Sequence, residues 1–161
     1  MTAGPDRSHG CDFGGACLLV IDDEEGVRRV VRRMLAQSGC RVLEAANGLE
    51  GLLALEEGAV VDLVLTDLAM PRVGGLAVVE VLGRRRPEIP VVLMSGDGAA
   101  LRGAPQVPFL RKPFTSDELY RLVGELLSRA GRTHGTGQQL RAAAPEAPRP
   151  HGRTRYRPSP R

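Results

Sequence analysis

The chain has 161 residues, of which 42% are hydrophobic and 25% charged, a composition that fits one globular domain with additional segments. Its formal net charge of +3 is unevenly distributed, because residues 132–161 carry seven arginines against Glu146 alone. That segment has a charge of +6, which leaves −3 for residues 1–131. No apolar run approaches the roughly 20 residues of a membrane span, and residues 1–15 lack the apolar segment of a secretory signal. We therefore expect a cytoplasmic protein.

The cysteines agree with that expectation. Cys11, Cys17 and Cys40 are odd in number and form no CxxC pair, which is typical of reduced cytosolic thiols. A zinc site built from His9, Cys11 and Cys17 would have a spacing that matches none of the common ligand patterns. We expect neither a disulfide framework nor a zinc centre.

Strands and helices alternate in the first half of the predicted domain. The continuous apolar run Cys17–Ile21 predicts a strand covered on both faces, as in parallel sheets. A helix is predicted between Glu24 and Gly39, where apolar residues recur at helical spacing, acids occupy the first turn and glycine follows the end. The next predicted elements are a strand at Arg41–Ala45, a helix at Leu49–Glu57 and a strand at Val60–Thr66 that leads into Asp67.

The same alternation continues in the second half. The predicted elements are a helix at Leu76–Arg85, a strand at Pro90–Met94, a short strand at Gln106–Leu110 and a helix at Ser116–Arg129. Repeated strand–helix alternation predicts an α/β fold with a doubly wound five-stranded parallel sheet and helices on both faces. Between the last two strands, Gly103 and Pro105 limit the crossover to about one helical turn around Ala99–Arg102. We therefore expect a shortened fourth helix.

Regular periodicity is restricted to residues 16–130, which we predict to be the folded domain. Residues 1–15 and 131–161 are predicted to be a disordered arm and a disordered Arg/Pro/Gly-rich tail, because neither can bury enough apolar surface to offset its ordering entropy. The charge of the tail would permit weak contact with nucleic acid through counterion release. A passive tail is favoured, since Tyr156 is its only aromatic residue and no folded nucleic-acid-reading module accompanies it.

Polar residues stand at the carboxyl ends of the predicted strands. Asp22 and Asp23 follow the first strand, Asp67 ends the third, and Ser95 and Lys112 follow the fourth and fifth. Because the carboxyl ends of parallel strands share one edge, where open α/β folds bind ligands, we expect these five side chains to converge. Three carboxylates about 5 Å apart would repel by roughly 3 kcal/mol per pair at an effective dielectric of about 20. A hard divalent cation resolves that conflict, and Mg²⁺ is the ion we expect.

Lys112 is the only lysine in a chain with 21 arginines. Its retention favours a site that needs a compact ammonium rather than a planar guanidinium. An acidic cluster with one such cation suits phosphoryl transfer, in which a carboxylate acts as the nucleophile on phosphorus and the surrounding charges position the group.

Four blocks of sequence resemble the motifs of response-regulator receiver domains of two-component signalling. They are Val20-Ile21-Asp22-Asp23-Glu24, Leu65-Thr66-Asp67-Leu68-Ala69-Met70-Pro71, Met94-Ser95-Gly96 and Lys112-Pro113-Phe114. The resemblance covers about residues 16–130 and implies a flavodoxin-like sheet in the strand order 2-1-3-4-5. Met94-Ser95-Gly96 and Val107-Pro108-Phe109-Leu110 are also similar to the C-terminal receivers of hybrid sensor kinases.

The resemblance implies a metal site and an acceptor. Asp67 would be the phospho-acceptor. Asp23, Asp67 and the backbone carbonyl of Ala69 would ligate Mg²⁺ directly, and Asp22 would act mainly through metal-bound water.

It also implies roles for three residues around the acceptor. Lys112 would pair with the acceptor carboxylate and later with the phosphoryl oxygens, and its peptide bond to Pro113 would be cis. Ser95 would turn toward the phosphoryl group, and Phe109 occupies the position of the aromatic switch of the family.

Several of these residues also have a purely structural interpretation. Asp22 and Asp23 could cap a helix, and Asp67 and Ser95 could be turn residues. Four concordant blocks weigh against those interpretations for the acids. For Phe109 the choice between a core side chain and a switch stays open.

The function expected from the sequence is that of a phosphoacceptor receiver. A histidine kinase or phosphotransfer protein would donate to Asp67, and the added charge would switch the conformation that a downstream protein partner binds. Such a protein is not a turnover enzyme. One alternative is a docking module that keeps the fold but works without phosphorylation. Another is an aspartate-nucleophile phosphatase, which Ala69 disfavours because a second aspartate would be expected there.

Overall fold

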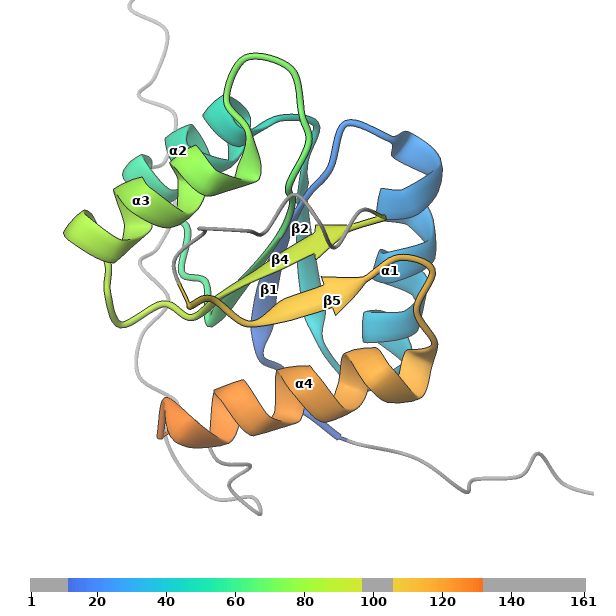
Figure 1. The fold of residues 1–161 in the computed structure, drawn as a ribbon. Coiled ribbons are helices and arrows are strands. Elements are labelled where there is room, and N and C mark those ends of the chain that lie inside the picture. Colours follow the sequence, from blue (N-terminus) through green and yellow to red (C-terminus); the bar gives the residue numbers. More distant parts are fainter. Residues whose placement is uncertain (1–11, 97–105, 132–161) are drawn as a thin grey trace, which may run out of the picture.

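Five parallel strands form one sheet at the centre of the structure, a computed structural model that describes residues 12–96 and 106–131 (Figure 1). The strand order is β2-β1-β3-β4-β5, which confirms the order expected from the family resemblance. The strands are β1 (Cys17–Ile21), β2 (Arg41–Ala45), β3 (Leu63–Asp67), β4 (Val91–Ser95) and β5 (Phe109–Arg111). All five run in the same direction, so their carboxyl ends lie at one edge of the sheet.

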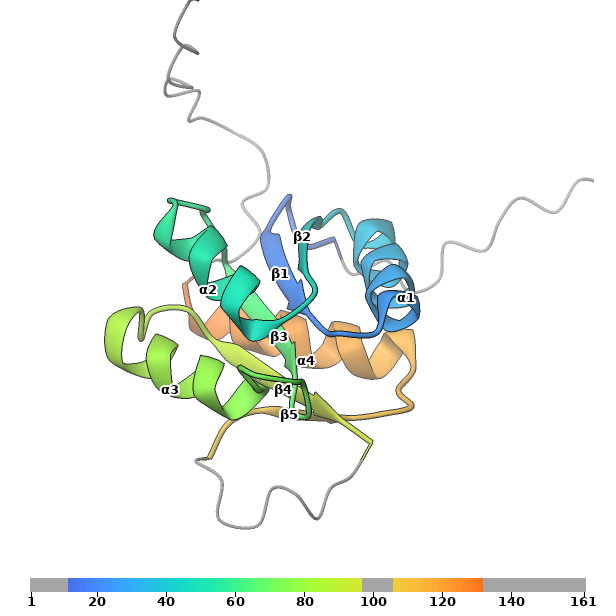
Figure 2. The same ribbon diagram turned by 90° about the horizontal axis from the view of Figure 1, so that it is seen from above.

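Helices cover both faces of the sheet in two pairs. The described part of the chain contains α1 (Glu25–Gln37), α2 (Gly48–Glu56), α3 (Gly75–Arg85) and α4 (Ser116–Arg129). Figures 1 and 2 show α1 and α4 on one face and α2 and α3 on the other, in agreement with the two clusters of buried side chains that these pairs form with the sheet. None of the described helices is both long and apolar enough to cross a bilayer.

The inner strands are the apolar runs of the sequence. Every residue of β1, β3 and β4 is buried, as expected for strands with helices on both sides. The edge strand β2 is mostly exposed, and only Ala45 is fully buried in it. Charged residues can occupy this strand because their side chains stay in contact with water.

Two strands differ from their predicted bounds. β3 begins at Leu63 instead of Val60, which is 74% exposed. Asp62, which precedes β3, is hydrogen-bonded twice to Cys17, the first residue of β1. Its carboxylate accepts from the Cys17 N–H at 2.7 Å, and its own N–H donates to the Cys17 carbonyl at 2.7 Å. β5 begins at Phe109 instead of Gln106, because the preceding Pro108 has no N–H to donate to a strand ladder.

The other elements lie within one residue of their predicted positions. β4 is shifted by one residue, so that Ser95 is its last residue. α2 begins one residue earlier than predicted because the Asn47 side chain caps it, accepting from the Glu50 N–H at 2.9 Å. The predicted turn at Ala99–Arg102 and the tail beyond Gly131 lie outside the described residues.

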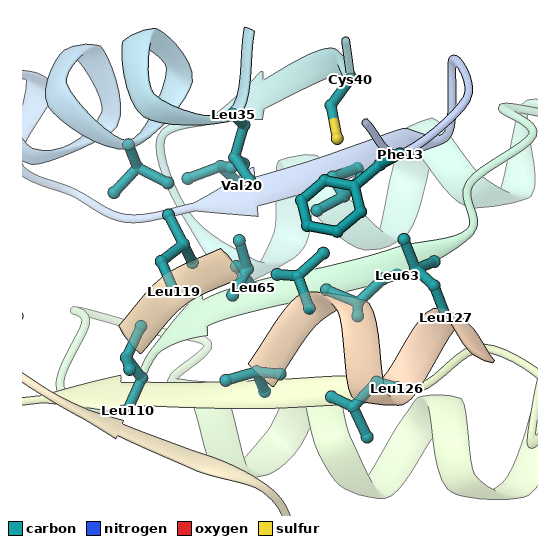
Figure 3. Close-up of a cluster of buried hydrophobic side chains, with 14 of the residues drawn as sticks. Phe13, Val20, Leu35, Cys40, Leu63, Leu65, Leu110, Leu119, Leu126 and Leu127 are labelled. Atoms are coloured by element: carbon teal, nitrogen blue, oxygen red, sulfur yellow. The ribbon is translucent and has the colours of Figure 1, made fainter. Parts of the chain in front are cut away.

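The folded unit includes a residue that precedes the predicted domain start at residue 16. Phe13 is 3% exposed, and its N–H donates to the Ser38 carbonyl at 2.9 Å. Its ring meets Tyr120 of α4 edge to face, with 6.1 Å between ring centroids. Figure 3 shows the ring pointing into the same cluster as Leu35 and Leu127. Phe13 therefore contributes to the core between α1 and α4.

Candidate functional site

The predicted site residues lie together at the carboxyl edge of the sheet. Asp22 follows β1 directly, Asp67 ends β3 and Ser95 ends β4. The strand register pairs Asp67 with Met94, and Ser95 with Arg111, the residue before Lys112. Parallel pairing therefore brings residues from four separate parts of the chain to one place, as the sequence predicts.

Lys112 joins two carboxylates at the centre of the site. Its Nζ lies 2.7 Å from Asp22 Oδ2 and 2.6 Å from Asp67 Oδ1. Burial acts to lower the pKa of Lys112, but the hydrogen bonds and charges of Asp22 and Asp67 outweigh it and raise the pKa above its ordinary value of 10.5. The ammonium is therefore charged at neutral pH and fixed between the two acids.

Backbone amides hold the remaining oxygens of these two acids. Asp67 Oδ2 accepts from the Ala69 N–H at 2.9 Å, and Asp22 Oδ1 accepts from the Glu24 N–H at 2.9 Å. Asp22 is fully buried, whereas Asp67 is 7% exposed. Of the two carboxylates that Lys112 contacts, Asp67 is thus the one with an exposed surface.

Asp23 lies beside this pair but is not part of it. Its side chain is exposed, in contrast to that of Asp22. Within residues 12–96 and 106–131, no three His, Cys, Asp or Glu side chains are grouped so as to hold a metal ion. The donor set nevertheless suits Mg²⁺ in kind, because Asp22, Asp23 and Asp67 offer oxygen atoms only. With one ammonium among three carboxylates the site has a formal charge of −2, which one divalent cation would balance.

Ser95 and Phe109 take different positions around the acceptor. Ser95 is 5% exposed, and its carbonyl accepts from the Lys112 N–H at 2.8 Å. Phe109 is half-buried, belongs to neither core cluster, and lines a surface hollow with Arg121 and Leu122 of α4. Phe109 is therefore not a core side chain, and its role as a switch stays a prediction.

An apolar groove that the sequence analysis did not predict adjoins the site. It has a volume of about 450 Å³ and runs between α1 and the segment after β5, where the Lys112–Pro113 peptide is cis, as the family resemblance implies. Lys112, Pro113 and Phe114 form one wall, and the other is formed by residues of α1 that include Val30. Val30 is 52% exposed. Val30 is one of the apolar residues that recur at helical spacing between Glu24 and Gly39, and that spacing does not distinguish a buried residue from one that lines a groove.

Sequence comparison identifies related proteins. The sequence profile of the response regulator receiver domain matches residues 18–124. The sensor kinase CckA of Brucella abortus (strain 2308) is 36% identical over an alignment of 122 residues that covers 72% of this chain and 13% of that protein. The DNA-binding transcriptional regulator NtrC of Escherichia coli (strain K12) is 36% identical over an alignment of 114 residues that covers 68% of this chain and 24% of that protein. The chain thus spans about a quarter or less of the length of these relatives.

Solved structures give the same result. The receiver domain of the hybrid histidine kinase CckA matches with a TM-score of 0.60 and 34% identity, over 70% of this chain and 99% of that chain. The response regulator TrrA of Thermotoga maritima, solved in complex with Mg²⁺ and BeF, matches with a TM-score of 0.63 and 28% identity, over 70% of this chain and 99% of that chain. Fold and sequence therefore agree on the same group of proteins.

Proposed function

The chain belongs to the response regulator receiver domain family of two-component signalling, and from this we propose that Asp67 accepts a phosphoryl group from a histidine kinase or a phosphotransfer protein. The observation that carries the proposal is the 2.6 Å contact between Lys112 Nζ and Asp67 Oδ1 at the carboxyl edge of the sheet. It supplies a carboxylate nucleophile with a compact cation beside it. The protein acts as an acceptor in a phosphorelay and not as a turnover enzyme.

The proposed step is a displacement at phosphorus. A carboxylate oxygen of Asp67 forms a bond to the phosphorus of a phosphohistidine, the phosphorus–nitrogen bond breaks, and the imidazole of the donor leaves and takes up a proton. The aspartyl phosphate carries more negative charge than the carboxylate. Lys112 is already charged and within hydrogen-bond distance of Asp67, so it can neutralise part of that charge without a large movement.

We propose Mg²⁺ as the cofactor of this site. Asp23, Asp67 and the carbonyl of Ala69 would hold it, and Asp22 would assist through water. The cation supplies neutralisation of the phosphoryl oxygens. The oxygen-only donor set and the −2 charge support this proposal, as does the Mg²⁺ complex of the related TrrA. The exposed Asp23 side chain would have to join the other two acids for the site to form.

The apolar groove is the proposed docking site for the phosphodonor. Lys112 lines the groove and also contacts Asp67, so a helix seated in the groove lies next to the acceptor. Val30 offers an exposed apolar surface to such a helix.

We propose that this phosphoryl transfer takes place in the cytoplasm.

The proposed output is a conformational change that a downstream protein reads. Ser95 lies on the strand next to Asp67 and would turn toward the phosphoryl group. Phe109 is half-buried at the surface beside α4, a position from which a rotamer change alters an exposed hollow. These two residues would therefore connect the acceptor to the surface.

Labelling with acetyl phosphate tests the proposal. Wild-type protein should take up one phosphoryl group in the presence of Mg²⁺, and chelation of the metal or the substitution Asp67→Asn should abolish the uptake. Absence of Mg²⁺-dependent labelling in the wild type would instead support the alternative of a docking module that works without phosphorylation.

A further inference from the structure

Arg28 of α1 bonds the backbone at the acidic doublet. Its Nη1 donates a 2.7 Å hydrogen bond to the backbone carbonyl oxygen of Asp22, six residues earlier in the chain. The Arg28 side chain is only 15% exposed, which is low for an arginine on the outer surface of a helix. Neither the spacing of the motifs nor the charge pattern pointed to this contact.

The carbonyl that Arg28 holds belongs to the peptide that joins Asp22 to Asp23. A peptide unit is planar, so fixing its oxygen also fixes the direction in which the Asp23 backbone leaves it. Asp22 is held in several other ways, by Lys112, by the Glu24 N–H and by the 3.2 Å bond from its own N–H to the Ala45 carbonyl. In the part of the chain that the structure describes, the Asp23 side chain has no hydrogen bond or ion pair of its own. The position from which that side chain starts is therefore set by the peptide that Arg28 holds.

Glu44 holds the guanidinium of Arg28 from the other side. The Nε of Arg28 lies 3.9 Å from Glu44 Oε1 on β2, and the Nε of Arg32 lies 3.4 Å from Glu44 Oε2. Figure 2 shows α1 and the edge strand β2 side by side, as these contacts require. The guanidinium of Arg28 thus lies between Glu44 on β2, at ion-pair distance, and the Asp22 carbonyl after β1, to which it is hydrogen-bonded.

Arg29 provides a contrast on the same helix. Its side chain is 68% exposed, and its Nη2 bonds only Glu25 Oε1, at 2.6 Å, one helical turn away. Such exposed pairs contribute little to stability or geometry. Arg28 and Arg29 therefore carry the same charge at adjacent positions, but only Arg28 contacts the acidic doublet.

We infer that Arg28 is a positioning residue for Mg²⁺: by holding the carbonyl of the Asp22–Asp23 peptide, it keeps the Asp23 backbone where its carboxylate can turn toward the cation that Asp67 shares. The inference rests on the proposed function, because it assumes that cation. It makes the affinity for Mg²⁺ depend on Arg28, a residue that lies outside the acidic cluster. Outer groups that orient metal ligands typically change affinity by about 10-fold to 100-fold when removed.

Calorimetric titration of the full chain with MgCl₂, without a phosphodonor, tests the inference. Arg28→Met removes the hydrogen bond and keeps an apolar stem, and Arg29→Met removes an equal charge from the next residue. Loss of a positive charge alone favours cation binding, so Arg29→Met should bind Mg²⁺ as tightly as wild type or slightly more tightly. Arg28→Met should raise the dissociation constant by about tenfold relative to Arg29→Met. Arg28→Lys keeps the charge but not the planar fork, and its dissociation constant should lie between those of the two methionine variants.

The outcomes separate this inference from the proposed function. If the wild type binds no Mg²⁺, the proposed cofactor and this inference both fail. If the wild type binds Mg²⁺ and Arg28→Met binds it as tightly as Arg29→Met, only the role of Arg28 is overturned. Thermal unfolding shows whether Arg28→Met is folded. If it is not, Arg28→Lys carries the test, and a dissociation constant no higher than that of Arg29→Met overturns the inference.

Discussion

At the scale of single residues, the site depends on one small cation between two acids. Lys112 uses a single nitrogen atom to reach Asp22 Oδ2 at 2.7 Å and Asp67 Oδ1 at 2.6 Å. A guanidinium spreads its charge over a wide planar fork and would push the two carboxylates apart. We therefore expect Lys112→Arg to slow Mg²⁺-dependent labelling by acetyl phosphate about a hundredfold, although the charge is unchanged.

Arg111→Lys is the matched control for this substitution. Arg111 is the adjacent residue and is exposed, so exchanging its charged group should leave the initial labelling rate unchanged. A Lys112→Arg protein that labels at the wild-type rate would show that the site needs a positive charge but not a compact one.

Cys40 makes the stability of the protein depend on pH in the alkaline range. Burial raises the pKa of the Cys40 thiol from 9.0 to about 12, with further contributions from the negative charges of Asp12 and Asp62. The unfolded chain therefore loses this proton at a lower pH than the folded one. The free energy of unfolding should fall as the pH rises from about 9 toward 12 and should not respond to this group below that range.

Urea unfolding of wild type and Cys40→Ala at about pH 8 and about pH 10 measures this effect. The stability of the wild type should fall more between the two pH values than that of the variant. Equal losses in both proteins would mean that the buried thiol does not contribute. The same raised pKa predicts that Cys40 reacts slowly with alkylating reagents in the folded protein.

The sequence predicted the acceptor site better than it predicted the residues that support it. Asp22, Asp67 and Lys112 were predicted because parallel strands bring their carboxyl ends together, whatever the details of packing. The contact of Arg28 with a backbone carbonyl leaves no pattern in the sequence. For the same reason Val30, one of the apolar residues at helical spacing, gave no sign that it lines an open groove.

At the scale of elements, close packing of α3 sets the position of the acceptor strand. Gly75 begins α3, and a Cβ atom added to it would overlap the Asp67 carbonyl oxygen at the end of β3. Relief of that overlap requires movement of backbone and not of a flexible side chain. Gly75→Ala should therefore destabilise the protein by about 1–3 kcal/mol and reduce labelling of Asp67, because β3 and α3 must separate.

Gly83→Ala on the same helix is the control. A Cβ atom at Gly83 meets no atom within 4 Å, and alanine forms helices better than glycine by about 1 kcal/mol. Urea unfolding should thus show opposite signs for the two glycine substitutions. A Gly75→Ala protein as stable as Gly83→Ala would show that β3 and α3 tolerate a wider separation.

Element bounds were predictable where local signals were strong. α4 begins and ends where predicted, and its N-terminus has a capping box in which Thr115 and Glu118 satisfy each other's backbone N–H groups. The start of β3 was wrong because Val60 is apolar but exposed. Hydrophobicity indicates burial only on average. At this point the Asp62 carboxylate accepts a hydrogen bond from the Cys17 N–H, and the pairing of β3 with β1 begins only after it.

At the scale of the whole molecule, the domain extends at least to Phe13, before the predicted start at residue 16. Phe13 fills the space between the end of α1 and α4, and Tyr120 bonds the Met34 carbonyl at 2.7 Å across the same gap. We expect Phe13→Ala to lower the free energy of unfolding by about 3–5 kcal/mol, through lost burial and the cavity left behind.

Leu49→Ala serves as the comparison for that substitution. Leu49 lies on α2 and is 51% exposed, so its truncation should change the urea midpoint little. If Phe13→Ala is no less stable than Leu49→Ala, residues before Ala16 contribute nothing to the core. The residues around Phe13 are polar, and a single aromatic residue forms no helical or strand pattern. The sequence therefore gave no reason to include Phe13 in the predicted domain.

The architecture as a whole was predictable because it follows from simple rules. Buried apolar runs alternating with amphipathic helices permit few arrangements other than a parallel sheet with helices on both faces. The strand order came from the family resemblance, and the structure confirms it. The length of the predicted turn at Ala99–Arg102 stays a prediction, because it lies outside the described residues.

Chemical localisation of the phosphoryl group tests the central claim most directly. Borohydride reduces an aspartyl phosphate to homoserine, which peptide mass spectrometry can place in the sequence. After reaction with acetyl phosphate and Mg²⁺, we expect homoserine at position 67 and at no other aspartate. Homoserine at Asp22, Asp23 or Asp62, or its absence from a protein that has taken up phosphate, would contradict the assignment of Asp67 as the acceptor.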